Sequence, residues 1–249
     1  MPSHISSSLA MLAAVAGAAM PAHAQTCMAK SSAQAMAVVE LYTSEGCNSC
    51  PPADRWLSQL KDDPSVIALA FHVDYWDRLG WADRFASAAF TQRQAQQQAV
   101  NGSRFSYTPQ VVIDGIDRKD WPQVSADSKG AIKAKPARVQ LTLQREGEQF
   151  EATVQTLAAP AKLAAYWAVT EDKHVTAVKG GENSGVTLQH NDVVRELLPV
   201  SAWQAQLGQP TTLHFSPATR ADAAHPRQVK LVVLDAATGR PVQALKLGC

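Results

Sequence analysis

The sequence lacks the features that define several common functional classes. Its 23 lysines and arginines nearly balance 22 acidic residues, and no basic run occurs, so we expect neither a nucleic acid nor an anionic membrane surface as a partner. No serine-hydrolase elbow, HExxH zinc motif or dinucleotide-binding fingerprint is present. Beyond the N-terminal region, no apolar run is long enough to span a bilayer. The sequence therefore gives no motif for a serine hydrolase, an HExxH zinc protease or a dinucleotide-dependent enzyme.

Residues 1–24 are predicted to be a secretory signal peptide. An apolar run from Leu9 to Met20 precedes the small-residue site Ala22-His23-Ala24, although the n-region contains no Lys or Arg. The run is too short to cross a membrane. We therefore expect cleavage before Gln25 and a periplasmic or secreted protein.

The most informative stretch is Cys47-Asn48-Ser49-Cys50, which lies between a predicted strand and a predicted helix. The apolar run at 37–42 is typical of a buried strand, and residues 53, 56, 57 and 60 form one apolar stripe of a helix that begins at two prolines. Both sulfurs then lie at a helix N-terminus, where the helix dipole favours a thiolate. This context favours a redox-active pair. A zinc site and a purely structural disulfide stay open, although no second Cys-x-x-Cys completes a four-sulfur site.

The remaining two cysteines, Cys27 and Cys249, lie near the two ends of the predicted mature chain. Thiols tend to pair in an oxidising compartment, and chain termini often lie close together. If Cys47 pairs with Cys50, a structural Cys27–Cys249 disulfide is therefore predicted. Free or intermolecular terminal thiols are the alternative.

Further elements follow the cysteine motif. Val66–Val73 reads as a strand buried on both faces, residues 87–101 as a helix capped by Ser87, and Thr108-Pro109 as the entry to a short strand followed by a hairpin turn. A weaker helix is predicted from Trp121, Val124, Ala131 and Ile132. The aromatic loop at 74–81 is either packed under the chain or a substrate rim. His72 is expected to be structural rather than a ligand or base.

From residue 136 onward the pattern changes to short runs that alternate with period two. Such runs occur at 139–143, 150–154, 163–169, 193–200, 211–215, 229–234 and 242–247, which predicts a β-sandwich. Gly180–Gly185 lacks the ending of a phosphate-binding loop and is predicted to be a β-turn. His174, His190, His214 and His225 have no metal-ligand spacing, so we expect no metal site and no cofactor.

Three segments, ELYTSEGCNSCPPAD, HVDYWDRLGW and YTPQVVIDG, resemble a secreted bacterial thioredoxin-like family catalogued as a domain of unknown function, number twelve twenty-three. Residues 180–197 resemble that family's second half. The resemblance implies an α/β thioredoxin-like domain at 25–135, with a helical insertion at 74–101. Together with the alternating runs beyond it, the predicted fold is this domain followed by an all-β sandwich-like domain at 136–249. The resemblance also implies a cis Pro109 facing the cysteines. Glu40 occupies a place similar to thioredoxin's buried acid, but seven residues before Cys47 rather than six.

The sequence thus predicts an exported thiol–disulfide oxidoreductase whose partners are protein clients and a redox partner protein. Cys47 is expected to be the more exposed sulfur and to attack, Cys50 to resolve the mixed disulfide, and Glu40 to accept the proton of Cys50. The alternative is a soft-metal module that binds Cu(I) through Cys47 and Cys50, with His72 as a third ligand. Asn48-Ser49 differs from thioredoxin's Gly-Pro, and the direction of electron flow stays open.

Overall fold

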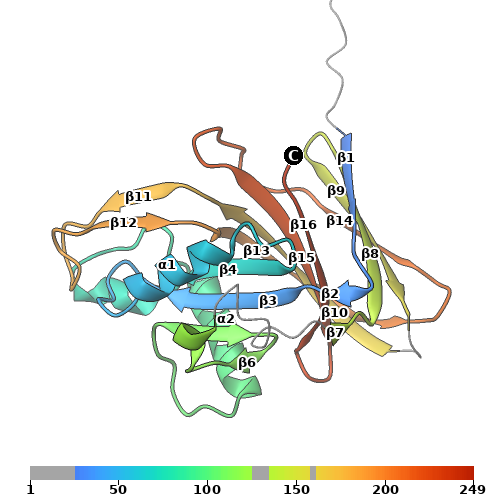
Figure 1. Ribbon diagram of the computed structural model, residues 1–249, viewed down its shortest axis with the longest axis horizontal. Coiled ribbons are helices and arrows are strands. Elements are labelled where there is room, and N and C mark those ends of the chain that lie inside the picture. Colours follow the sequence, from blue (N-terminus) through green and yellow to red (C-terminus); the bar gives the residue numbers. More distant parts are fainter. Residues whose placement is uncertain (1–25, 125–134, 158–160) are drawn as a thin grey trace, which may run out of the picture.

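The computed structural model describes residues 26–124, 135–157 and 161–249, and β-strands dominate it (Figure 1). The largest sheet has eight strands in the order β16-β15-β10-β13-β4-β3-β5-β6. Their bounds are β3 (Ala37–Thr43), β4 (Val66–His72), β5 (Gln110–Ile113), β6 (Ile116–Asp117), β10 (Ala161–Glu171), β13 (Val193–Ala205), β15 (Arg227–Asp235) and β16 (Pro241–Leu247).

A second sheet has four strands in the order β1-β8-β9-β14, which are β1 (Thr26–Lys30), β8 (Val139–Glu146), β9 (Gln149–Thr156) and β14 (Thr211–Phe215). Two short pairs complete the strands: β2 (Gln34–Ala35) with β7 (Lys135–Pro136), and β11 (His174–Ala177) with β12 (Thr187–His190). The helices are α1 (Pro51–Leu60), α2 (Ala88–Val100) and two 3-10 segments, η1 (Asp74–Leu79) and η2 (Trp121–Gln123).

The centre of the large sheet is the parallel pair β3–β4, in which every residue is buried. Alternate residues point to opposite faces, because successive side chains of a strand alternate. On one face Val39 and Leu41 pack against α1. On the other, Val38 and Tyr42 pack in the same cluster as Phe90 of α2. The two helices therefore cover opposite faces of the sheet at this end.

The four-stranded sheet covers the other end of the large sheet. Its inward side chains from β8, β9 and β14 join those of β10, β15 and β16 in one apolar cluster around Trp167 and Phe215, whose rings stack 5.2 Å apart. The alternating burial of β8 and β9 fits a strand with one face in the core and one in solvent. Figure 1 shows this layer beside the large sheet, far from α1.

The predicted fold class, an α/β thioredoxin-like domain followed by an all-β sandwich-like domain, is wrong. The chain is mostly β, and strands from both predicted parts share the eight-stranded sheet. The connection is Val193 of β13, which pairs in parallel with Ala70 of β4. The boundary predicted at residue 136 falls inside β7. The apolar runs predicted as strands between residues 37 and 247 do form strands. The period and length of a run, however, do not determine which strands pair with each other.

Most predicted local elements are present. The strand at Val66 is confirmed. So is the helix capped by Ser87, whose side chain accepts a hydrogen bond from the Ala89 N–H. Of the weak helix predicted near Trp121, only the short η2 is seen, and Ala131 and Ile132 lie outside the described residues. So does the predicted signal peptide. Within residues 26–124, 135–157 and 161–249, no helix is long and apolar enough to cross a membrane.

Two lysines bind the C-terminal strands to the N-terminal ones. Lys230 of β15, 1% exposed, donates to the carbonyl of Ala68 on β4 at 2.8 Å and to the carboxylate of Asp192 at 2.5 Å. Lys246 of β16 donates to three carbonyl oxygens from the end of α1 to the first residue of β4, at 3.1 to 3.3 Å. A buried ammonium needs such partners, because burial without them is very costly. The lysines therefore help to fix how the two parts of the sheet meet.

Lys230→Met should lower the free energy of unfolding by about 3–5 kcal/mol, because it leaves the Asp192 carboxylate buried without its cation. Lys230→Met combined with Asp192→Asn should recover part of that loss. Chemical denaturation measures both. Lys162→Met on β10, where the lysine is exposed, is the control and should change stability by less than about 0.5 kcal/mol. A Lys230→Met protein as stable as the wild type would contradict this role.

Candidate functional site

Cys47 and Cys50 form a disulfide at the start of α1, directly after β3 and its turn. The first helical turn contains Pro51 and Pro52, which lack the N–H groups that a helix start leaves unpaired anyway. Both cysteines are 0% exposed, so the expectation that Cys47 is the more exposed sulfur is wrong. Asn48 and Ser49 between them are exposed. The sulfurs therefore lie just beneath the surface of the loop.

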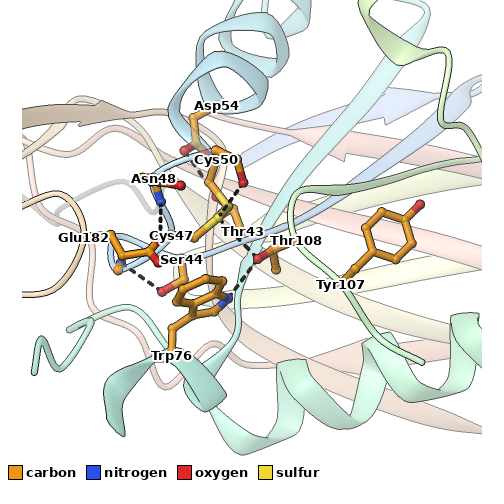
Figure 2. The surroundings of a disulfide bond; sticks show 12 residues. Thr43, Ser44, Cys47, Asn48, Cys50, Asp54, Trp76, Tyr107, Thr108 and Glu182 are labelled. Carbon is orange, nitrogen blue, oxygen red and sulfur yellow. Dashed lines mark hydrogen bonds between the residues drawn. A yellow bond between two sulfur atoms is a disulfide. The ribbon is translucent and has the colours of Figure 1, made fainter. Parts of the chain in front are cut away.

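Thr108 covers the Cys47 sulfur. The Thr108 hydroxyl donates to Cys47 Sγ at 3.3 Å and accepts the indole N–H of Trp76 at 2.8 Å (Figure 2). Because the indole occupies a lone pair of the hydroxyl oxygen, the hydroxyl proton is directed at the sulfur. The Thr108–Pro109 peptide bond is cis, as the sequence predicted. The Ser49 hydroxyl lies 3.4 Å from the same sulfur. Cys47 thus has two hydroxyl neighbours that can stabilise a thiolate.

A polar cluster is buried below the turn that carries Cys47. Asp83 Oδ2 lies 2.7 Å from His72 Nδ1 and accepts the Glu45 backbone N–H at 2.8 Å. Burial opposes ionisation of Asp83, but the charge and hydrogen bond of His72 outweigh it and lower the pKa of Asp83 to about 2. Burial likewise disfavours the charged form of His72, and Asp83 reverses this, so the pKa of His72 is raised. Both shifts therefore favour the charged pair over a neutral one.

Sequence spacing did not reveal that three histidines meet here. The ring centres of His72 and His190 are 5.0 Å apart, and Phe85 contacts both of them and His174. His190 Nε2 lies 3.3 Å from Glu45 Oε1, and the indole of Trp81 donates to the other carboxylate oxygen at 2.8 Å. Among the described residues, no three His, Cys, Asp or Glu side chains are arranged to hold a metal ion. His72, which was expected to be structural, and His190, which has no metal-ligand spacing in the sequence, both lie in this buried cluster.

Glu40 does not lie at the cysteines, contrary to the role predicted for it. Its side chain points to the α2 face of the sheet, where its carboxylate accepts hydrogen bonds from Arg93 at 2.6 Å, Tyr42 at 2.5 Å and Tyr166 at 2.8 Å. Burial disfavours its charged form, but Arg93 outweighs that and lowers its pKa. Strand alternation explains the error: Thr43, three residues on, faces α1, so Glu40 faces away from it.

The carboxyl group that does lie on the cysteine side is Asp54, which the sequence analysis did not single out. Asp54 is one turn into α1 from Cys50, is 7% exposed, and accepts a hydrogen bond from the Thr43 hydroxyl at 3.2 Å (Figure 2). Burial raises the pKa of Asp54. The sequence carries no signal for this burial, because an acid in the first turn of a helix is favoured by the helix dipole and is ordinarily exposed.

The second disulfide, Cys27–Cys249, is remote from this site. It joins β1 to the residue that ends the chain, after β16 (Figure 1). Cys27 is half-buried and Cys249 is exposed. This bond links the edge of the four-stranded sheet to the edge of the eight-stranded sheet.

Residues 38–234 match the model of a protein family, described as Protein of unknown function (DUF1223). The chain belongs to this DUF1223 family. The match begins in β3 and ends in β15, so it includes both cysteines of the site, Thr108, and residues 180–185. A search of curated proteins finds no significant match.

Two solved structures share the architecture. One is the crystal structure of an Agrobacterium tumefaciens protein, with 28% identity, a TM-score of 0.63, and coverage of 86% of this chain and 94% of that one. The other is HBP35 of Porphyromonas gingivalis, with 13% identity, a TM-score of 0.60, and coverage of 87% and 76%. The second likeness is one of fold alone.

Asp83→Asn should be least stable relative to the wild type between about pH 4 and 6.5. The folded pKa of Asp83, about 2, lies below its ordinary value of 3.8, so its contribution is present above 3.8 and is lost as the pH falls through 2. The raised pKa of His72 gives stability below 6.5 that is lost as the pH rises. The difference in free energy of unfolding between the wild type and Asp83→Asn should therefore shrink by about 2 kcal/mol from pH 5 to pH 2.

Urea unfolding at several pH values measures this gap. Asp62→Asn, whose side chain is 88% exposed, is the control and should follow the wild type at every pH. A gap that stays constant from pH 5 to pH 2 would show that Asp83 does not stabilise through its charge.

Proposed function

We propose that this protein is an exported thiol–disulfide oxidoreductase that acts on protein thiols and disulfides through Cys47 and Cys50. The observation that carries the proposal is the hydrogen bond from the Thr108 hydroxyl to Cys47 Sγ, in a disulfide closed over three residues at a helix N-terminus. Hydroxyl donors and the positive end of a helix both stabilise a sulfur that leaves or attacks as a thiolate. A disulfide that only braces the loop has no need of them.

The exchange proceeds in two steps. A client thiolate attacks Cys47 Sγ, which forms a client–Cys47 disulfide, breaks the Cys47–Cys50 bond and releases Cys50 as a thiolate that takes up a proton. A second client thiolate then attacks the client sulfur, which forms a client disulfide and releases Cys47. The client loses two electrons and the cysteine pair gains them. The same steps in reverse reduce a client disulfide, and the reduction potentials set the direction.

Access to the sulfur requires a small local opening, because Cys47 is buried. The groups above it are few: Thr108 and Trp76 are half-buried, and Asn48 and Ser49 are exposed. Displacement of the Thr108 and Ser49 side chains would remove the two hydroxyl groups that contact Sγ. Cys50 lies inside the first turn, next to the buried Ala53 and Asp54. Cys47 is therefore the sulfur that a client would reach.

Asp54 takes the role that the sequence assigned to Glu40. Its carboxyl group lies on the cysteine side of α1, and burial raises its pKa, so it can hold a proton closer to neutral pH than an ordinary aspartate. As Cys50 leaves, Asp54 supplies a proton; in the reverse step it accepts one.

Cys50→Ala, after reduction, should form stable mixed disulfides with client proteins through Cys47, because no resolving thiol remains. Cys47→Ala should form few and should be inactive in insulin reduction. Non-reducing electrophoresis and mass spectrometry of the trapped complexes measure both. Cys27→Ala/Cys249→Ala is the control, and its exchange activity should equal that of the wild type.

Three results would contradict the proposal or its assignments. Trapping through Cys50 instead of Cys47 would reverse the roles of the two sulfurs. Exchange activity unchanged by both single substitutions would exclude the function. Tight Cu(I) binding by the reduced protein without exchange activity would favour the soft-metal alternative, although His72 is held by Asp83 on the buried side.

Asp54→Asn should slow disulfide exchange at least about ten-fold and flatten its pH dependence, because an amide cannot carry the proton of Cys50. Stopped-flow exchange with a small-molecule disulfide, from pH 5 to 9, measures both. Glu40→Gln is the matched control: it should reduce stability, since Arg93 loses its buried partner, but the exchange rate of the folded protein should not change. A slower exchange rate in Glu40→Gln together with an unchanged rate in Asp54→Asn would instead assign the proton transfer to Glu40.

A further inference from the structure

The loop that joins β11 to β12 rests on the disulfide loop, although 134 residues separate Asn48 from Glu182. The side chain of Asn183, 5% exposed, donates to the carbonyl oxygen of Glu45 at 2.8 Å and to that of Cys47 at 2.9 Å. One amide group thus holds the backbone on both sides of Gly46. The sequence reading of residues 180–185 as a plain turn did not reveal this contact.

Two glycines fix the position of the loop. A Cβ atom on Gly180 would lie 2.4 Å from the carbonyl oxygen of Gly80, so no other residue fits without a shift. Gly181 has a φ of 68°, and a Cβ there would lie 3.2 Å from Trp81, so glycine is favoured on both grounds. The 180–183 backbone is therefore packed directly against residues 80–81 and 46. The residue that follows, Glu182, is held in one place.

Glu182 directs its carboxylate at the backbone beside Cys47. Its Oε2 accepts the Asn48 N–H at 3.1 Å (Figure 2). This occupies the backbone donor of the residue that follows Cys47 and puts the negative charge of an exposed carboxylate beside that residue. Both effects disfavour a thiolate at Cys47, because a nearby like charge and the loss of a donor each destabilise an anion.

We propose that Glu182 is a positioning residue that restrains thiolate formation at Cys47 and thereby favours the disulfide form of the pair. The inference rests on the proposed thiol–disulfide chemistry. A less stable thiolate at Cys47 raises the free energy of the reduced pair relative to the disulfide. The reduced pair is then more easily oxidised, which makes it a stronger reductant. Asn183 supports this by holding the loop, while Glu182 supplies the charge.

Glu182→Gln tests the charge, because glutamine keeps an oxygen acceptor for Asn48. In the reduced Cys50→Ala background, iodoacetamide should alkylate Cys47 about three-fold faster at pH 6 and low ionic strength, and the gain should disappear in 1 M salt. With both cysteines intact, the equilibrium constant for oxidation of the pair by glutathione should fall about three-fold. This second measurement does not depend on the folding of Cys50→Ala.

Glu196→Gln is the matched control. The Glu196 carboxylate also accepts backbone N–H groups, those of Ala218 and Thr219, but it lies on β13 away from the disulfide. Glu196→Gln should change neither the alkylation rate of Cys47 nor the equilibrium with glutathione. Equal alkylation rates and equal glutathione equilibrium constants for Glu182→Gln and the wild type would overturn the inference. A faster alkylation that persists in 1 M salt would also overturn it, because that increase would come from a loosened loop and not from the charge. If the wild type fails to reduce insulin but Glu182→Gln still alters the alkylation rate and the glutathione equilibrium, the proposed function fails, and only the effect of Glu182 on the Cys47 sulfur is retained.

Discussion

The structure depends on the contacts of one aspartate, Asp192, the residue before β13. Its carbonyl oxygen accepts the Ala70 N–H of β4 at 2.9 Å, and its carboxylate binds the buried Lys230 of β15. Its own N–H bonds to Asp172, the residue after β10. Three segments of the chain therefore converge on one residue. Because this is where the strands before and after residue 136 join, the eight-stranded sheet and the loops at its end depend on it.

The local elements could be predicted because each depends on residues close in sequence. The apolar run before Cys47, the paired prolines and the stripe of α1, and the Ser87 cap are all short-range signals, and the structure contains them. The pairing of β13 with β4 could not be predicted. It rests on a single parallel register point, Val193 with Ala70, and on Lys230, a charged residue that any hydrophobicity pattern assigns to the surface.

The same distinction applies to the site. The cysteine pair and the cis Thr108–Pro109 bond were found in short motifs, and both are present. Glu40 was misplaced because a difference of one residue in a strand moves a side chain to the opposite face. Asp54, Asp83, His190 and Asn183 come from four separate segments and have no common spacing. Only the folded chain brings them to one loop, so no sequence period could have identified them.

The bond between Cys27 and Cys249 closes the described chain into a covalent ring of 222 residue steps. In a ring, one cut of the backbone produces a single nicked molecule and no free fragment. A protease that cleaves the turn between β8 and β9, where Glu146 and Glu148 are exposed, would therefore leave the two pieces linked through sulfur as well as through the shared sheet. Two cuts, or one cut and a reductant, are needed before any part can diffuse away. This arrangement protects the integrity of the molecule independently of how stable its folded state is.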